Sequence, residues 1–144
     1  MKVILQLSMY VSIFVLASCT AGKHTKDEVE QAMKQYDHLI LKMDTDSIAL
    51  LYTDDGDLGN MAHGRDSIRK FLAGFKNMKV ISQSSTTDTI TINGDTSLQK
   101  GLYHQTVIVA EKDTVKVKGT YTATWLWKQQ DGWHIKRMET KPVQ

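Results

Sequence analysis

The stretch that most constrains the fold is residues 119–140, which hold all three tryptophans of the chain and are dense in β-branched and aromatic residues. The segment Gln-Gln-Asp-Gly at 129–132 divides this stretch into two runs that alternate apolar and polar residues. Alternation on both sides of a turn sequence is typical of a β-hairpin. The sequence therefore predicts two paired antiparallel strands near the C-terminus.

Neighbouring side chains on a strand point to opposite sides of the sheet, so the alternation assigns each residue to a face. A turn that closes with two or four residues places on one face Thr122, Thr124, Leu126, Trp133, Ile135, Arg137 and Glu139. The other face then carries Tyr121, Ala123, Trp125, Trp127, His134, Lys136 and Met138. Both faces are too apolar to be left in water. We expect helices of this chain to cover the first face and a second copy of the protein to cover the other.

The region before the strands has a helical pattern. Residues 27–43 carry an apolar stripe, and Asp46 is a plausible N-cap for a second, shorter helix with Ile48, Leu51 and Tyr52. Residues 53–57 are predicted to end that helix in a turn, and residues 58–62 to form a short strand or an irregular arm. A third helix is predicted after Gly64, with apolar spacing at Ile68, Phe71, Leu72 and Phe75.

From residue 80 onward the pattern has a period of two. We expect strands at 80–92, 96–109 and 114–128, separated by turns at 93–94 and 111–113, and leading into the final hairpin. Helices followed by strands indicate an α+β fold. The predicted architecture is three N-terminal helices packed in the concave face of a curved antiparallel sheet of about four long strands.

Composition excludes several kinds of function. Lys and Arg number 18 against 16 Asp and Glu, a near balance that argues against a nucleic-acid surface. The five histidines show no ligand spacing and there is one cysteine, so we predict no metal site and no cofactor. Phosphate-binding, dinucleotide-binding and nucleophile-elbow motifs are not found in the sequence.

The N-terminal residues have the pattern of a cleaved signal peptide. Residues 1–18 combine Lys2 with an apolar run shorter than the roughly 20 residues that span a bilayer. Leu-Ala-Ser-Cys at 16–19 resembles the bacterial lipobox, which implies cleavage before Cys19 and lipidation of that residue; an ordinary secretory leader is the alternative. Residues 19–26 would then be the lipidated cysteine and a tether, and 27–144 one domain. By resemblance to the sorting rules of envelope lipoproteins, Thr20 after the cysteine favours the outer membrane, which would place the domain in the cell envelope on the periplasmic side.

Three motifs follow one another along the chain: Ala-Leu-Leu-Tyr-Thr-Asp-Asp at 49–55, Gly-Arg-Asp-Ser-Ile-Arg-Lys-Phe at 64–71 and Asp-Gly-Trp-His-Ile at 131–135. In this order they resemble the nuclear-transport-factor-2-like superfamily, which includes steroid isomerases and SnoaL-like proteins. The resemblance implies a cystatin-like cone with a ligand pocket at its open end and, in many relatives, a homodimer through the outer sheet. It implies that the pocket is lined by Tyr36, Tyr52, Asn60, Thr122, Thr124, Trp133, Arg137 and Glu139. The expected dimer face is Tyr121, Trp125, Trp127 and Met138.

The resemblance also bears on catalysis. Tyr36 matches a tyrosine that donates to the oxyanion in steroid isomerases, but Asn60 stands at the position of the catalytic base and cannot take up a proton. We therefore assign no catalytic residue, although Asp57, His63 or Glu139 could serve as a base in principle. Arg137 and Glu139 either hold a ligand or pair with each other. We expect a membrane-tethered, non-catalytic domain that binds a small, partly apolar ligand; the alternatives are an isomerase, cyclase or hydrolase, and a structural or protein-interaction module.

Overall fold

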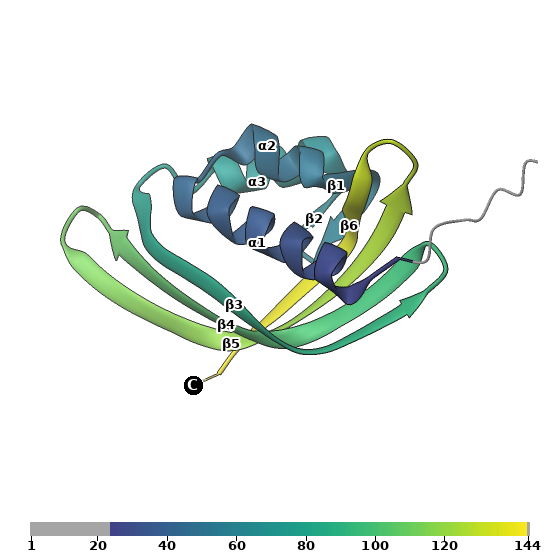
Figure 1. Ribbon diagram of the computed structural model, residues 1–144. Helices are drawn as coiled ribbons and strands as arrows, with labels where there is room; N and C mark the ends of the chain where they lie inside the picture. Colours follow the sequence, from purple (N-terminus) through teal and green to yellow (C-terminus); the bar gives the residue numbers. More distant parts are fainter. Residues whose placement is uncertain (1–23, 144) are drawn as a thin grey trace, which may run out of the picture.

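A strongly curved sheet with helices on its concave side forms the molecule, and the computed structural model describes residues 24–143 (Figure 1). In the described part the sheet has six strands in the order β2-β1-β6-β5-β4-β3, and the helices α1, α2 and α3 precede or interrupt the first strands. The predicted α+β class and the packing of the helices in the concave face are confirmed. Two short strands, β1 and β2, extend the four long strands that the sequence predicted.

Helix α1, Lys26–Lys42, crosses the concave face of the sheet and packs mainly on β3. Its start is fixed by a capping box in which Thr25 accepts from the backbone of Glu28 and Glu28 accepts from the backbone of Thr25. The stripe at Val29, Met33 and Ile40 is buried, as the spacing predicted. The helix therefore supplies one wall of the cone.

Helix α2, Thr45–Leu51, begins two residues earlier than predicted, because Asp44 and not Asp46 caps it. The predicted turn at 53–57 is wrong: β1, Tyr52–Leu58, runs there and pairs in parallel with β6. Its ends are buried at Tyr52 and Leu58, while Asp54 and Asp55 between them face solvent and Asp57 is partly buried. β2, Ala62–His63, folds back on β1, and α3, Arg65–Ala73, follows Gly64 as expected.

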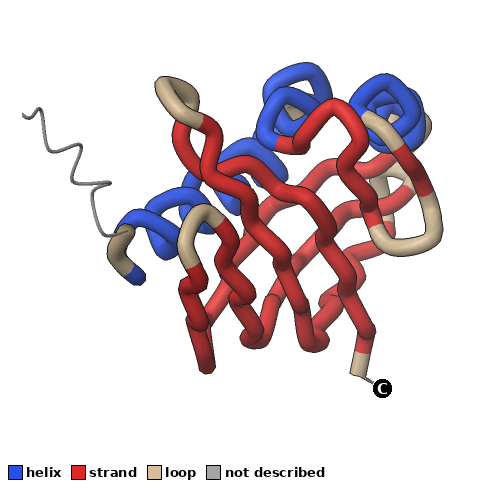
Figure 2. The backbone as a smooth tube through the Cα atoms, turned by 90° about the vertical axis from the view of Figure 1, so that its right-hand side faces the viewer, coloured by secondary structure: helices blue, strands red, loops and turns tan. Residues whose placement is uncertain are grey.

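The long strands are close to those predicted: β3 is Met78–Asn93, β4 is Thr96–Val109, β5 is Asp113–Lys128 and β6 is Gly132–Pro142. They form an antiparallel meander whose curvature is clear in the tube view (Figure 2). Gly101 and Gly119 are buried at the bend, each directly opposite a tyrosine, Tyr121 and Tyr103 respectively. A glycine allows the strand to bend, and an aromatic ring on the partner strand covers the gap it leaves.

The predicted register of the last hairpin is wrong because its turn has an odd number of residues. Lys128 pairs with Gly132, so three residues form the loop, and Trp127 lies directly opposite Trp133. Gln130 has a φ of 76° and Gly132 a φ of 88°, the left-handed conformations that such three-residue hairpins use. A turn that is one residue longer or shorter than expected moves all side chains of one strand to the other face of the sheet. Consequently Trp125 faces Ile135 on the helix side.

A bulge then changes the alternation within β6. Trp125 pairs with Ile135 and Thr124 with Arg137, so Lys136 has no partner across the ladder. Beyond the bulge, Met138 lies opposite Ala123 on the inner side. The core therefore contains three residues that were assigned to the dimer face, Tyr121, Trp125 and Met138, each at most 3% exposed. That assignment is wrong for them, and Trp127 is also partly buried against the core.

A chain of buried polar groups runs along the inner face of the sheet. The indole Nε1 of Trp125 donates to Gln99 Oε1 at 2.9 Å, and Gln99 Nε2 donates to Thr87 Oγ1 at 2.8 Å. Thr87 and the Tyr121 hydroxyl are 3.1 Å apart. Because buried polar groups are costly when unpaired, this network favours one rotamer for each member.

Among residues 24–143, none of the helices has the length and apolar character that crossing a bilayer requires. The same residues contain no group of three or more acidic, histidine or cysteine side chains placed to hold a metal ion.

Candidate functional site

A cavity of about 230 Å³ lies inside the cone between α1, α3 and the concave face of the sheet. Its apolar wall includes Met33, Ile40, Leu58, Phe71, Leu72 and Phe75. Its polar wall is made by Tyr36, Gln83, Ser85, Tyr103, Gln105 and Tyr121. Larger hollows of about 600 and 470 Å³ lie at the rim and back of the sheet, but short stretches of strand and turn bound each of them. Core side chains from two helices and the sheet line the cone cavity, unlike these two hollows.

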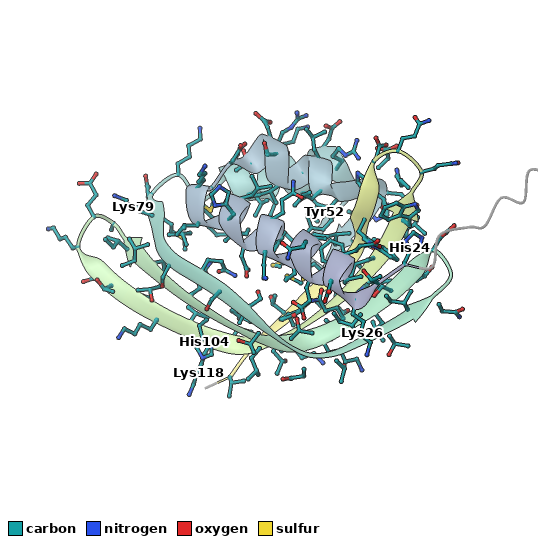
Figure 3. All side chains as sticks on the ribbon, in the orientation of Figure 1. His24, Lys26, Tyr52, Lys79, His104 and Lys118 are labelled. Carbon is teal, nitrogen blue, oxygen red and sulfur yellow. The ribbon has the colours of Figure 1, made fainter. Side chains whose placement is uncertain are left out.

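Tyr36 lines this cavity from α1, as the resemblance implied, and its hydroxyl interacts with that of Tyr52. Burial raises the pKa of Tyr36 to about 12, while the interaction with Tyr52 opposes the rise. Burial, and then the neighbouring Tyr36, also raise the pKa of Tyr52 well above its ordinary value. Tyr52 is fully buried in the core between helices and sheet (Figure 3), and within the described residues its hydroxyl has no partner with good hydrogen-bond geometry. Both tyrosines are therefore neutral groups in an apolar setting.

Raising the pH above about 10 is expected to destabilise the fold through these tyrosines. The unfolded chain ionises near 10, whereas folded Tyr36 keeps its proton to about 12, so its stabilisation is complete below 10 and is lost between the two values. Two pKa units correspond to about 2–3 kcal/mol for this residue. Urea unfolding between pH 8 and 12 should show a shallower fall for Tyr36→Phe than for the natural chain. Equal slopes would contradict this account of Tyr36.

Asp37 joins α1 to β3 beside the cavity. Its Oδ1 accepts from Gln83 Nε2 at 2.9 Å and from Ser85 Oγ at 2.8 Å, and its Oδ2 accepts from the Ser85 backbone at 2.7 Å. Hydrogen bonds to a carboxylate are stronger than those between neutral groups. Asp37 therefore fixes both the position of the helix and the orientation of two cavity side chains.

Most of the residues predicted to line the pocket lie elsewhere. Thr122 and Thr124 face away from the helices, on the convex side, because of the register described above. Trp133 is buried on the inner side, but it packs against Trp127 rather than lining the cavity. Of the predicted set, Tyr36 is the one that lines the cavity, with Tyr52 behind it.

Arg137 and Glu139 pair with each other, which was one of the two interpretations given for them. Arg137 Nη2 and Glu139 Oε1 are 2.7 Å apart on the outer side of β6. Arg137 also reaches Asp57 and Asn60, both at 3.4 Å. They therefore belong to a surface cluster outside the cone.

That cluster borders a hollow of about 320 Å³ at the β1–β2 hairpin. The shortest polar contact of the cluster joins Asp57 Oδ1 to His63 Nδ1 at 2.6 Å, and the His63 side chain is 75% exposed. The hydrogen bond from His63 lowers the pKa of Asp57, and Arg137 adds to this effect. The hollow contains Asn60, so the residue at the expected position of a catalytic base lies here.

The convex face of the sheet is polar and basic rather than aromatic. Figure 3 shows His104 and Lys118 on this side, pointing away from the helices, and they are directly opposite each other on β4 and β5. Leu98 and Leu102 are exposed on the same face of β4. A homodimer through the outer sheet stays a prediction, and these residues, not the tryptophans, would form its interface.

The tryptophans at the end of the hairpin instead hold the start of α1. The ring of His24 lies 4.4 Å from that of Trp127 and 4.9 Å from that of Trp133, and its nitrogens contact Glu28 and Asp95. These contacts fix the N-terminal end of the described chain against the β3–β4 and β5–β6 hairpins. Cys19, the predicted lipidation site, and the predicted leader lie outside the described residues.

Sequence reasoning missed the cavity residues of β3 and β4, including Gln83, Ser85, Tyr103 and Gln105. In β3, both faces are rich in Ser and Thr, so alternation gives no inward face there. One signal was present in the sequence, namely Gly101 and Gly119 within two predicted strands that also carry Tyr103 and Tyr121. These glycines mark the bend of β4 and β5.

Comparison with known proteins bears on the fold. The model of the SnoaL-like domain family matches residues 24–139. A ketosteroid isomerase-like protein from Erwinia carotovora atroseptica aligns with a TM-score of 0.71 and 16% identity, over 82% of this chain and 95% of that one. A nuclear transport factor 2-like protein from Salmonella enterica gives a TM-score of 0.68 and 14% identity, over 82% and 90%.

An NTF2-like protein with a cystatin-like fold from Novosphingobium aromaticivorans has a TM-score of 0.66 and 18% identity, over 81% and 80% of the two chains. A search of curated proteins gave no match. At these identities the structural neighbours establish the fold alone, whereas the family model covers most of the chain. The chain therefore belongs to the SnoaL-like domain family, and it shares its fold with nuclear transport factor 2-like and ketosteroid isomerase-like proteins.

Proposed function

We propose that this domain binds a small, neutral, largely apolar molecule in the cone cavity and does not transform it. The observation that carries the proposal is the cavity of about 230 Å³ with an apolar wall from α1 and α3 and a polar wall from the sheet. Pockets for drug-sized ligands usually measure roughly 300–1,000 Å³, so the size favours a molecule of one or two rings. A few polar groups on an apolar surface are sufficient to orient such a ligand.

The lining chemistry favours binding over acid–base catalysis. The cavity is bordered by tyrosines, amides, Ser85 and Thr140, and among the described residues no aspartate, glutamate or histidine contributes to the lining. A general base must reach the proton that it removes within hydrogen-bond distance. Asp57 and His63 have the chemistry of an acid–base pair, but they border the outer hollow at the β1–β2 hairpin and not the cone cavity.

Filling the mouth of the cavity should abolish binding. Thr140 lines the cavity and is exposed, so Thr140→Trp adds a large ring there without disturbing the buried core. We expect the affinity for a neutral two-ring probe, 2-methoxynaphthalene, to fall at least tenfold in calorimetric or NMR titrations.

The matched control is Thr120→Trp, which adds the same ring on the convex face. It should leave the affinity unchanged. Equal binding by both variants, or no binding of any neutral ring compound by the natural chain, would refute the proposed site.

We further propose that Cys19 carries lipid and anchors the domain at the periplasmic side of a membrane. The support is the leader pattern of residues 1–18, which ends in the motif Leu-Ala-Ser-Cys at 16–19. Several acyl chains together give firm anchoring, since each buried CH₂ contributes about 0.8 kcal/mol. In cell fractionation, Cys19→Ser should move the protein from the membrane to the soluble fraction; unchanged membrane association would count against lipidation.

A further inference from the structure

The four long strands are basic, whereas the part of the chain before them is acidic. Strands β3 to β6 together carry eight Lys and Arg against three Asp and Glu. Residues 24–77, which form the three helices and the β1–β2 hairpin, carry seven against ten. The near balance of the whole chain therefore conceals a segregation of charge between the long strands and the helix side of the molecule.

Basic side chains gather where the sheet is most strongly bent. Gly101 and Gly119 are buried on the inner side of the bend, so the residues next to them in sequence point outward. Figure 3 shows two of these outer side chains, His104 and Lys118, on the side away from the helices. We define the convex patch as five exposed residues that lie next to these glycines or directly opposite an outward residue: Lys100, Leu102, His104, Lys118 and Lys141.

The positive charge of the convex patch is not neutralised within the described part of the chain. None of its three lysines forms an ion pair with any of residues 24–143. Of the three acidic residues on the long strands, Glu139 is bound by Arg137 at 2.7 Å, and Asp88 and Asp113 form no ion pair with the patch. A partner for this surface must therefore be anionic.

The surroundings of the patch combine basic groups with exposed apolar ones. Leu98 and Leu102, which are 38% and 40% exposed, alternate with Lys100 along β4. The hollow of about 470 Å³ on the back of the sheet adjoins them, and its lining includes His104, Lys118 and Val143. Cations beside apolar side chains suit the interface of a phospholipid bilayer, where phosphate groups lie above the acyl chains.

The predicted lipid anchor would hold this surface close to a bilayer. His24 Nε2 contacts Asp95 Oδ1 at 3.2 Å, in the turn between β3 and β4. Leu98 follows three residues later on β4, a distance of about 10 Å along a strand. The five residues from Cys19 to His24 span at most about 18 Å when fully extended. A membrane that holds Cys19 is therefore within reach of the convex side.

From this arrangement we infer that the convex patch docks on a bilayer that contains anionic phospholipids, with the helices facing away from the membrane. The nearness of the bilayer rests on the lipidation proposed above, whereas the charge complementarity does not depend on it. A second copy on the same surface would bring lysines against lysines, which is unfavourable. The bilayer is therefore the occupant that the charges favour.

The test measures co-sedimentation with vesicles of phosphatidylcholine, either pure or containing about 30% phosphatidylglycerol. It uses residues 19–144 with Cys19→Ser, which contain every described residue and carry no lipid. At low salt we expect about 100-fold tighter binding to the anionic vesicles, because each of three lysines near such a surface contributes about fivefold. The triple variant Lys100→Gln, Lys118→Gln, Lys141→Gln should reduce this preference to about threefold or less. High salt should release the natural sequence from the vesicles.

The matched control is the triple variant Lys34→Gln, Lys42→Gln, Lys70→Gln, which removes the same charge from exposed positions of α1 and α3. It should keep the preference for anionic vesicles. Thermal unfolding establishes that both variants are folded. If the patch variant does not fold, the single variant Lys118→Gln decides, with an expected loss of about fivefold.

Four outcomes would overturn the docking surface. They are equal binding to both vesicle types, equal losses in the two triple variants, tighter binding to a short DNA duplex than to the anionic vesicles, and a dimer that the patch variant dissociates. None of them bears on lipidation, which is tested separately by fractionating cells that carry Cys19→Ser in high salt, where electrostatic docking is released. Failure of the anchor and failure of the patch are thus distinguishable.

Discussion

Replacing Trp125 with alanine is expected to lower the free energy of unfolding by about 4 kcal/mol, a large share of the 5–15 kcal/mol typical of a domain. Trp125 is fully buried, and its indole donates to Gln99. The substitution therefore leaves both a cavity and an unpaired amide oxygen in the core. Urea unfolding followed by far-ultraviolet circular dichroism measures the effect.

Trp127→Ala is the matched control, because the sequence pattern assigned the two residues to the same outer face, the predicted dimer face. Trp127 is only partly buried and contacts Trp133 and His24 at the end of the hairpin. Its loss should lower the free energy of unfolding by about 1–2 kcal/mol, at most half the effect at Trp125. Equal effects, or a Trp125→Ala variant that alters self-association with unchanged stability, would contradict the core assignment and support an outer face.

The fold class was accessible from the sequence because its signals are strong and local. The stripes at Val29, Met33 and Ile40 and at Ile68 and Leu72 are buried as their spacing predicted. Turn sequences marked the ends of the long strands within a few residues. Agreement between local pattern and tertiary burial is what allows such a prediction to succeed.

The faces of the last hairpin were not accessible in the same way, because they depend on the parity of one turn. Alternation separates Trp125 from Thr124 but does not say which faces inward, and a three-residue loop reverses the result of a two- or four-residue loop. The bulge at Lys136 then reverses the alternation once more, so Ile135 and Met138 share the inner side. The loop length therefore misplaced residues on β5, and the bulge misplaced the residues of β6 that follow it.

The site was predictable only where the resemblance supplied a position. Tyr36 lines the cavity as implied, whereas Arg137 and Glu139 pair outside it. Gln83 and its aspartate, Asp37, are 46 residues apart in sequence, and neither belongs to a recognisable motif. Contacts of that kind arise from the crossing of α1 over β3, which sequence periodicity does not specify.

Replacing Gly101 with alanine is the second substitution with a large expected effect, a loss of about 3 kcal/mol in the free energy of unfolding. A Cβ at this position would overlap the Thr86 carbonyl oxygen and lie 2.9 Å from Cε1 of Tyr121. Neither can yield easily, since one is backbone of the adjacent strand and the other is a buried ring opposite the glycine. The sheet must flatten locally or Tyr121 must move.

Lys100→Ala is the control, since Lys100 is exposed on the neighbouring position of β4 and should change stability by no more than about 0.5 kcal/mol. The two variants should differ in urea midpoint at an unchanged dependence on urea concentration. Because the Tyr121 ring also lines the cavity, Gly101→Ala should weaken the binding of 2-methoxynaphthalene under conditions where the variant remains folded. A stable Gly101→Ala protein with unaltered binding would mean that the bend of the sheet does not depend on the missing side chain.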